Sequence, residues 1–134
     1  MSPGQSSTVV ANVSHEVQGS ILVTKLVGRA GINVLRDHVM SHYDLWAAHD
    51  RLIYDVSEWN VESLTSDALR DLPESFRPLI SAREQAWVAL VIKPHLEELA
   101  RILLAIFESE GVPVELRYFF DRPSAAGWLL EQKP

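Results

Sequence analysis

Cysteine is absent from this chain, and so is any long hydrophobic run. Without cysteine there is no disulfide, no thiolate nucleophile and no cysteine-ligated zinc or iron–sulfur site. No apolar stretch reaches the roughly 18 residues that a transmembrane helix needs. The opening MSPGQSST lacks the basic and apolar regions of a signal peptide. We therefore expect a cytoplasmic protein with no membrane span.

Positive charge is also scarce, since 12 Lys and Arg face 18 Asp and Glu for a net charge of −6. An acidic domain gains no counterion-release energy on nucleic acid, and anionic membrane surfaces repel it. We expect neither as a partner. A chain of 134 residues, 47% hydrophobic, suffices for one domain with its own core.

The first half of the chain changes its hydrophobic period twice. Partial alternation over residues 8–17, a Gln18-Gly19 turn signal and the run SILVTKLVG predict an antiparallel hairpin. A three-to-four-residue period from Ala30 to His49 predicts one helix. The β-branched and aromatic run at 51–57 predicts a third strand.

The second half predicts alternating helices and strands. Helical spacing over 61–79 is interrupted by prolines, and the apolar QAWVALVI that follows suits a strand covered on both faces. Pro94 can open a helix that ends at Gly111, and Asp121 can cap a final helix after a strand at 113–120. We expect a flexible segment 1–7 and a single α/β domain 8–134. Its sheet is mixed and five-stranded, with an N-terminal antiparallel hairpin followed by parallel βα units.

The junction RLIYDVSEWNVESL at 51–64 is the first candidate site, because ligands of open α/β sheets collect beyond the carboxyl ends of the strands. Hydroxyls follow this strand, and a phosphate on one of them would add about −1.5 to −2 charges near a helix N-terminus. Capping of the helix is the competing interpretation. The candidate phosphoacceptors are Ser63, Thr65 and Ser66.

Four stretches resemble the STAS family, the anti-sigma-factor-antagonist-like domains: ILVTKLVGR, LIYDVSEW, AWVALVIKP and VELRYFFDRPSAAGWL. The resemblance covers nearly the whole chain from about Thr8 and is nearest to the STAS-like branch of small bacterial proteins. That branch is related in fold to CRAL-TRIO lipid-transfer domains. The resemblance implies helices packed mainly on one face of the sheet.

It also implies a binding module in which a kinase phosphorylates a serine of an Asp-Ser motif after the third strand. The family's Asp-Ser-Ser-Gly string is missing here, and Glu62-Ser63 is its nearest counterpart. Ser63 is therefore the best match, ahead of Thr65 and Ser66. The expected recognition loops follow the third and fourth strands and contain Asp55, Ser57, Trp59, Lys93 and His95.

Two further features are a histidine stripe on the helix expected at 30–49 and an apolar stripe on the helix expected at 96–107. On one continuous helix His38, His42 and His49 would lie within roughly 40° of each other, but no further ligand follows at a fixed spacing, so we expect no metal. The apolar stripe of the helix 96–107 is wider than docking on a sheet requires. It is either buried on two sides or partly exposed as a partner or ligand face that includes Ile102, Leu104 and Phe107.

No string in the chain pairs a nucleophile with a base, and the Walker, dinucleotide-binding and G-x-S-x-G motifs are absent. We therefore expect a non-catalytic, cytoplasmic binding or regulatory module without a cofactor, which recognises a protein partner. The alternative is a carrier of a lipid or small apolar ligand, and an enzyme comes third. A homodimer through the apolar helix or an edge strand is compatible with this pattern.

Overall fold

A mixed five-stranded sheet forms the centre of the protein, as predicted, with the strands in the order β2-β3-β4-β5-β6. The structure is a computed structural model that describes residues 12–29, 32–60, 70, 85–111 and 113–132. The strands are β2 (Asn12–Gln18), β3 (Ile21–Arg29), β4 (Arg51–Asn60), β5 (Ala86–Val91) and β6 (Val114–Phe119).

The N-terminal hairpin is confirmed. β2 and β3 pair antiparallel from Gln18 opposite Ile21 outward, which leaves a two-residue turn between them. Gly19 in that turn has φ of 63°, a left-handed conformation that tight hairpin turns require and glycine adopts without strain. This register places His15 opposite Thr24.

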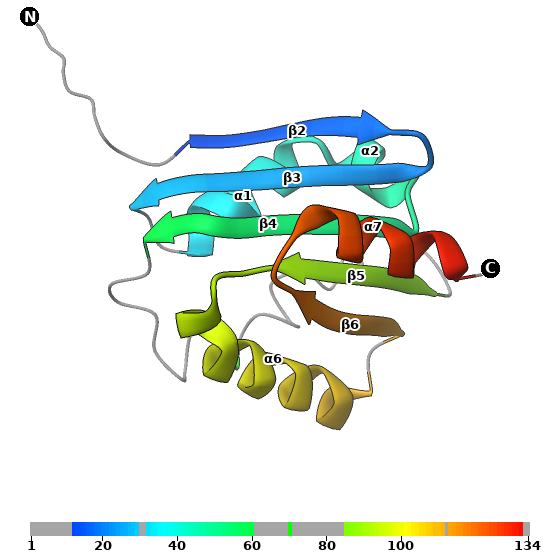
Figure 1. Ribbon diagram of the computed structural model, residues 1–134. Coiled ribbons are helices and arrows are strands. Elements are labelled where there is room, and N and C mark those ends of the chain that lie inside the picture. Colours follow the sequence, from blue (N-terminus) through cyan, green and yellow to red (C-terminus); the bar gives the residue numbers. More distant parts are fainter. Residues whose placement is uncertain (1–11, 30–31, 61–69, 71–84, 112, 133–134) are drawn as a thin grey trace, which may run out of the picture.

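The remaining pairs, β3–β4, β4–β5 and β5–β6, are all parallel. Their carboxyl ends therefore lie together at one end of the sheet, on the left in Figure 1. β5 carries the sequence AWVALV and is buried at nearly every position, as its uninterrupted apolar run predicts.

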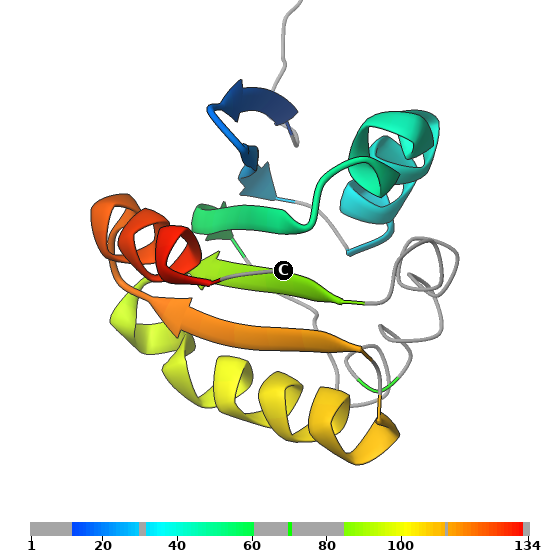
Figure 2. The same ribbon diagram turned by 90° about the vertical axis from the view of Figure 1, so that its right-hand side faces the viewer.

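Helices lie on both sides of this sheet. Figure 2 shows α7 on one face, α1 and α2 on the opposite face, and α6 running beside β6. The STAS-like arrangement is confirmed, and α7 is the helix that lies on the face opposite α1 and α2. The helices that lie within the described residues are α1 (Ile32–Ser41), α2 (Tyr43–Ala47), the short 3-10 helix η2 (Pro94–Leu96), α6 (Glu97–Glu110) and α7 (Arg122–Glu131).

Each face of the sheet has its own hydrophobic core. Trp46 of α2, fully buried, packs with Leu22, Leu26 and Leu52 on one face. On the other face the α7 side chains Ala125, Trp128 and Leu129 pack against Ile21, Val23, Ile53 and the odd-numbered positions of β5. Successive side chains of a strand point to opposite faces of the sheet, so each strand contributes side chains to both cores.

Two helix ends form as their residues predict. The Asp121 carboxylate accepts a hydrogen bond of 2.8 Å from the Ser124 backbone N–H and so caps α7. At the end of α6, Gly111 has φ of 66°, the left-handed conformation expected of a residue just past a helix.

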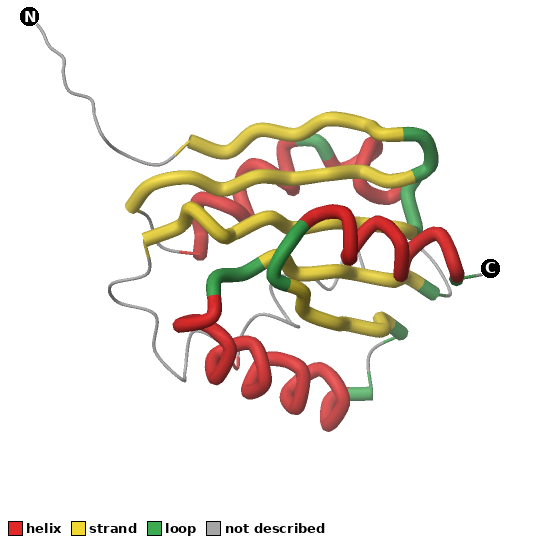
Figure 3. Tube along the Cα trace, viewed as in Figure 1, coloured by secondary structure: helices red, strands yellow, loops and turns green. Residues whose placement is uncertain are grey.

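Two boundaries differ from the prediction. The helix expected over 30–49 is divided at His42, whose backbone (φ −121°, ψ 38°) is not helical. The third strand, expected to end at Ser57, continues as β4 to Asn60 because β3 pairs with it that far. The helices expected over 61–79 lie almost wholly outside the described residues, as do Ser63, Thr65 and Ser66. Figure 3 shows the described helices in red and the described strands in yellow.

Candidate functional site

The carboxyl end of the parallel strands carries two of the predicted recognition residues. Lys93, which precedes η2, and His95, which lies within it, are both exposed just after β5. A backbone hydrogen bond of 2.9 Å from Ile92 N–H to Phe119 C=O holds this junction beside the end of β6. The two neighbouring strand ends therefore form one continuous rim.

An aromatic side chain stands on the same rim. Phe120 follows β6 directly and is 50% exposed, although it is a large apolar residue. Its ring lies edge-on to that of Tyr118, with 6.0 Å between the centroids. Tyr118 in turn donates a 2.6 Å hydrogen bond to Glu97 at the start of α6, which also accepts one from Arg101. The Phe120 ring thus rests on a neighbour that is fixed by hydrogen bonding.

Asp55, Ser57 and Trp59 were expected in a loop, and the structure corrects this expectation. All three lie within β4, which continues past them to Asn60. Asp55 is 6% exposed and Trp59 is 8% exposed, so neither side chain is displayed to a partner. Paired neighbours in the sheet extended the strand, a long-range effect that local composition does not reveal.

The buried Asp55 carboxylate connects the sheet to α7. One oxygen accepts hydrogen bonds from the Ser57 backbone N–H (3.0 Å) and hydroxyl (2.6 Å). The other accepts a 2.8 Å bond from Nε of Arg122, the first residue of α7. Arg122 also approaches Glu16 on β2 at 3.4 Å. A chain of charges therefore runs from the edge strand through the helix start to the sheet interior.

These contacts lower the pKa of Asp55 below its ordinary value. Burial alone raises the pKa of this carboxyl, but the hydrogen bonds from Ser57 and the charged Arg122 outweigh burial. An ionised carboxylate whose two oxygens both accept hydrogen bonds is a poor general base, because these bonds stabilise the ionised form over the protonated one. Asp55 is thus placed to fasten α7 to β4.

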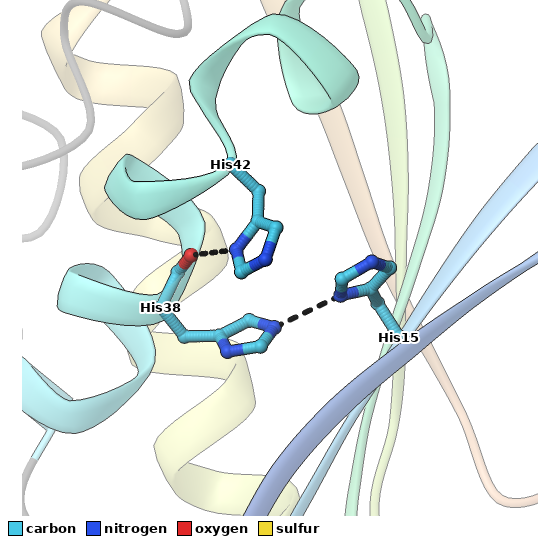
Figure 4. Close-up of side chains that lie close together, drawn as sticks. All are labelled: His15, His38 and His42. Carbon is cyan, nitrogen blue, oxygen red and sulfur yellow. Dashed lines mark hydrogen bonds between the residues drawn. The ribbon is translucent and has the colours of Figure 1, made fainter.

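On the opposite face three histidines converge. His38 at the end of α1 and His42 at the helix break are joined by His15 of β2, while the predicted His49 is not part of this group. One ligand nitrogen from each ring can be chosen such that all lie within 4.8 Å of one another. Figure 4 shows the rings turned toward one another, with His15 Nδ1 and His38 Nε2 in hydrogen-bond contact at 3.0 Å.

Sequence reasoning missed His15, Phe120 and Arg122. His15 is 23 residues from His38, and only the hairpin register turns it toward α1. Its alternation with Val13, a residue of the same strand face, was the one available signal. Phe120 and Arg122 flank a capping aspartate and carry no motif.

The predicted apolar face of α6 divides into separate parts. Phe107 is buried, Leu104 is half-buried and Ile102 is 40% exposed. Leu104 and Phe107 line an open groove of about 380 Å³ between α6 and the start of β6. Pro113, Val114 and Leu116 line it beside Gln85, Glu108 and Glu115, so its walls are mixed in polarity.

No helix in the described part of the chain is long and apolar enough to cross a membrane. No protein-family model matches the sequence, and no curated protein matches it. The class is therefore defined by the fold alone, which is α/β of the STAS-like type.

Two solved structures carry this assignment. The first is an uncharacterized protein of the DUF3478 family with a SpoIIAA-like fold, from Shewanella loihica PV-4. It is 20% identical with a TM-score of 0.59 over 94% of this chain and 99% of that one. The second is an anti-sigma factor antagonist from Mycobacterium paratuberculosis, 14% identical with a TM-score of 0.61 over 90% and 95% of the two chains.

Proposed function

We propose that this chain is a non-catalytic regulatory module that binds a protein partner at the carboxyl end of its sheet. The single observation that carries the proposal is Phe120, an aromatic side chain 50% exposed on that rim. Large aromatic residues are the commonest anchors of protein interfaces, because one ring buries much apolar area with few rotatable bonds.

The rim is also held in place before any partner arrives. The cap between Asp121 and Ser124 fixes the residue after Phe120, and the bond between Ile92 and Phe119 fixes the strand before it. Little conformational entropy is then lost on binding, which favours affinity. The exposed Lys93 and His95 supply a polar border to the aromatic centre.

A protein partner agrees with the similarity to an anti-sigma factor antagonist, a protein whose name describes regulation of other proteins. Within this proposal Ser63, Thr65 and Ser66 are the sites where phosphorylation alters recognition, with Ser63 the first choice. A phosphate there would introduce negative charge into the segment that leaves β4.

Site-directed photo-crosslinking tests the rim directly. A benzophenone amino acid replaces Phe120 in one variant and Leu130, 65% exposed near the opposite end of α7, in a control. Extracts of the encoding organism should yield a discrete crosslinked protein with the first variant only. Equal crosslinking from both positions would contradict a partner site on the rim.

The modification sites need a second comparison. The Phe120 probe is combined with Ser63→Asp and separately with Ser63→Ala, which matches the loss of the hydroxyl without the charge. We expect the aspartate to change the crosslinked yield at least several-fold and the alanine to leave it near the wild-type yield. Identical yields from both would remove Ser63 from the proposal and leave the rim intact.

A further inference from the structure

The three histidines on the α1 side of the sheet have the geometry of a metal-ligand set. Their ring centroids are 5.2 Å apart for His15–His38 and 4.7 Å apart for the other two pairs. Three imidazoles bound to one tetrahedral ion at about 2.0–2.1 Å place their ring centroids about 5 Å apart. The observed triangle of rings has this size.

The nitrogen atoms are also near the distances that one ion demands. His15 Nδ1 and His38 Nε2 are 3.0 Å apart, and two ligands of a tetrahedral zinc ion are about 3.3 Å apart. The third nitrogen, from His42, lies within 4.8 Å of both. The His42 ring is exposed, so it can tilt toward the other two while its Nδ1–H stays on the His38 carbonyl oxygen.

The hydrogen bonding of His42 fixes which nitrogen can bind. Its Nδ1 lies 2.9 Å from the backbone carbonyl oxygen of His38. A carbonyl only accepts, so Nδ1 carries the proton and Nε2 keeps its lone pair. An N–H donated to a backbone carbonyl is the outer contact that commonly orients metal-bound histidines.

The surroundings of His15 and His38 hold these two rings in place and favour their neutral form. Fully buried Trp46 lies beneath the group, with its ring 5.1 Å from that of His15 and 5.7 Å from that of His38. Burial, followed by the neighbouring imidazoles, lowers the pKa of His15 and of His38 below the ordinary value. Neutral imidazole is the form that binds a metal.

We propose that His15, His38 and His42 bind one divalent transition-metal ion of the zinc class, with the fourth position directed to solvent. Imidazole ligands suit Zn²⁺, Cu²⁺ and Ni²⁺ and exclude Mg²⁺ and Ca²⁺, which prefer oxygen. The ion joins the edge strand β2 to the break between α1 and α2.

Calorimetric titration with ZnCl₂ tests the site. The wild-type chain should bind one equivalent, and His15→Gln, His38→Gln and His42→Gln should each weaken binding at least tenfold. His49→Gln is the matched control, because His49 Nδ1 makes the same contact with a backbone carbonyl, that of Leu45 at 2.8 Å, outside the group. It should bind like the wild type.

A spectroscopic readout separates ligation from loss of fold. Co²⁺ in a site of three imidazoles gives visible d–d absorption, which should disappear in His42→Gln while the variant's circular dichroism stays native. His42 is exposed, so its replacement leaves the core intact. Millimolar or weaker Zn²⁺ binding by the wild type, or equal losses in His42→Gln and His49→Gln, would overturn the proposal.

Discussion

The two faces of the sheet use their polar side chains in opposite ways. On the α7 face, Asp55 is ionised and engages both oxygens with Ser57 and Arg122. On the α1 face, the imidazole rings of His15, His38 and His42 gather against Trp46, and His42 keeps a lone pair on Nε2. The first arrangement satisfies itself and holds the fold together, whereas the second is completed by something from outside.

The comparison teaches that a buried charge and a reactive group are different things. Asp55 was one of the recognition residues predicted from the sequence, and it is more buried than the histidines. Its partners come from the same chain, so its burial reports on stability. The histidines are more exposed, and although His15 bonds His38 and His42 bonds a backbone carbonyl, His42 Nε2 keeps its lone pair.

The largest expected effect comes from removing the support beneath the histidines. Trp46→Ala should destabilise the protein by about 3–5 kcal/mol, because a fully buried indole leaves a large cavity. It should also weaken Zn²⁺ binding, since the rings lose the surface on which they rest. Urea unfolding gives the first quantity and calorimetry the second.

Trp128→Ala on the α7 face is the matched control for that comparison. Trp128 is 8% exposed and packs in the other core. A similar loss of stability is expected, on the order of 3–5 kcal/mol, with Zn²⁺ binding retained at a temperature where the variant is folded. Loss of Zn²⁺ binding in both variants would show that the two faces are not independent.

The next effect tests the carboxylate that fastens α7. Asp55→Asn should reduce the free energy of unfolding by roughly 1.5–3 kcal/mol, the range for hydrogen bonds to charged groups. Glu58→Gln is its counterpart, because Glu58 pairs with Lys25 at 2.6 Å with its side chain 52% exposed. That exposed pair should contribute less than about 1 kcal/mol. Equal effects in urea unfolding would contradict the distinction between them.

The same carboxylate predicts a pH dependence. The folded pKa of Asp55 lies below its ordinary value of 3.8, so its stabilisation is present above that pH. It is lost as the pH falls through the folded pKa, because the unfolded chain then binds the proton more readily. The stability difference between wild type and Asp55→Asn should therefore be constant above about pH 5 and shrink below it. A difference that grows on acidification would reverse the assignment.

The smallest effect concerns the start of α7. Asp121→Ala removes the cap on the Ser124 N–H and should destabilise the protein by about 1 kcal/mol. Asp121→Asn, which keeps an accepting oxygen, should recover most of that loss. Thermal unfolding of the two variants provides the measurement, and equal destabilisation would assign the effect to charge instead of capping.

Local patterns predicted the elements because each depends on neighbours in the chain. Gly19 marked the hairpin, the apolar run marked β5, and Gly111 and Asp121 marked helix ends. The extension of β4 past Ser57 could not be predicted, because it follows from pairing with β3. The helix break at His42 could not be predicted either, because no proline or glycine lies near it in the sequence.

The candidate sites were harder to predict for the same reason. His38 and His42 are four residues apart and were considered together, but no metal was expected there, because the third residue comes from another element, fixed by a hairpin register. Treating residues 30–49 as a single helix selected His49 in its place. Phe120 draws attention only through its exposure, a property that no sequence pattern states.

The contrast between the two faces is tested most directly by an amide and side-chain NMR titration with Zn²⁺. We predict shift changes confined to His15, His38, His42 and the Trp46 indole N–H, saturating at one equivalent. Resonances of Asp55, Arg122 and Phe120 should stay in place. Changes centred on the α7 face, or no saturable change at all, would contradict the account.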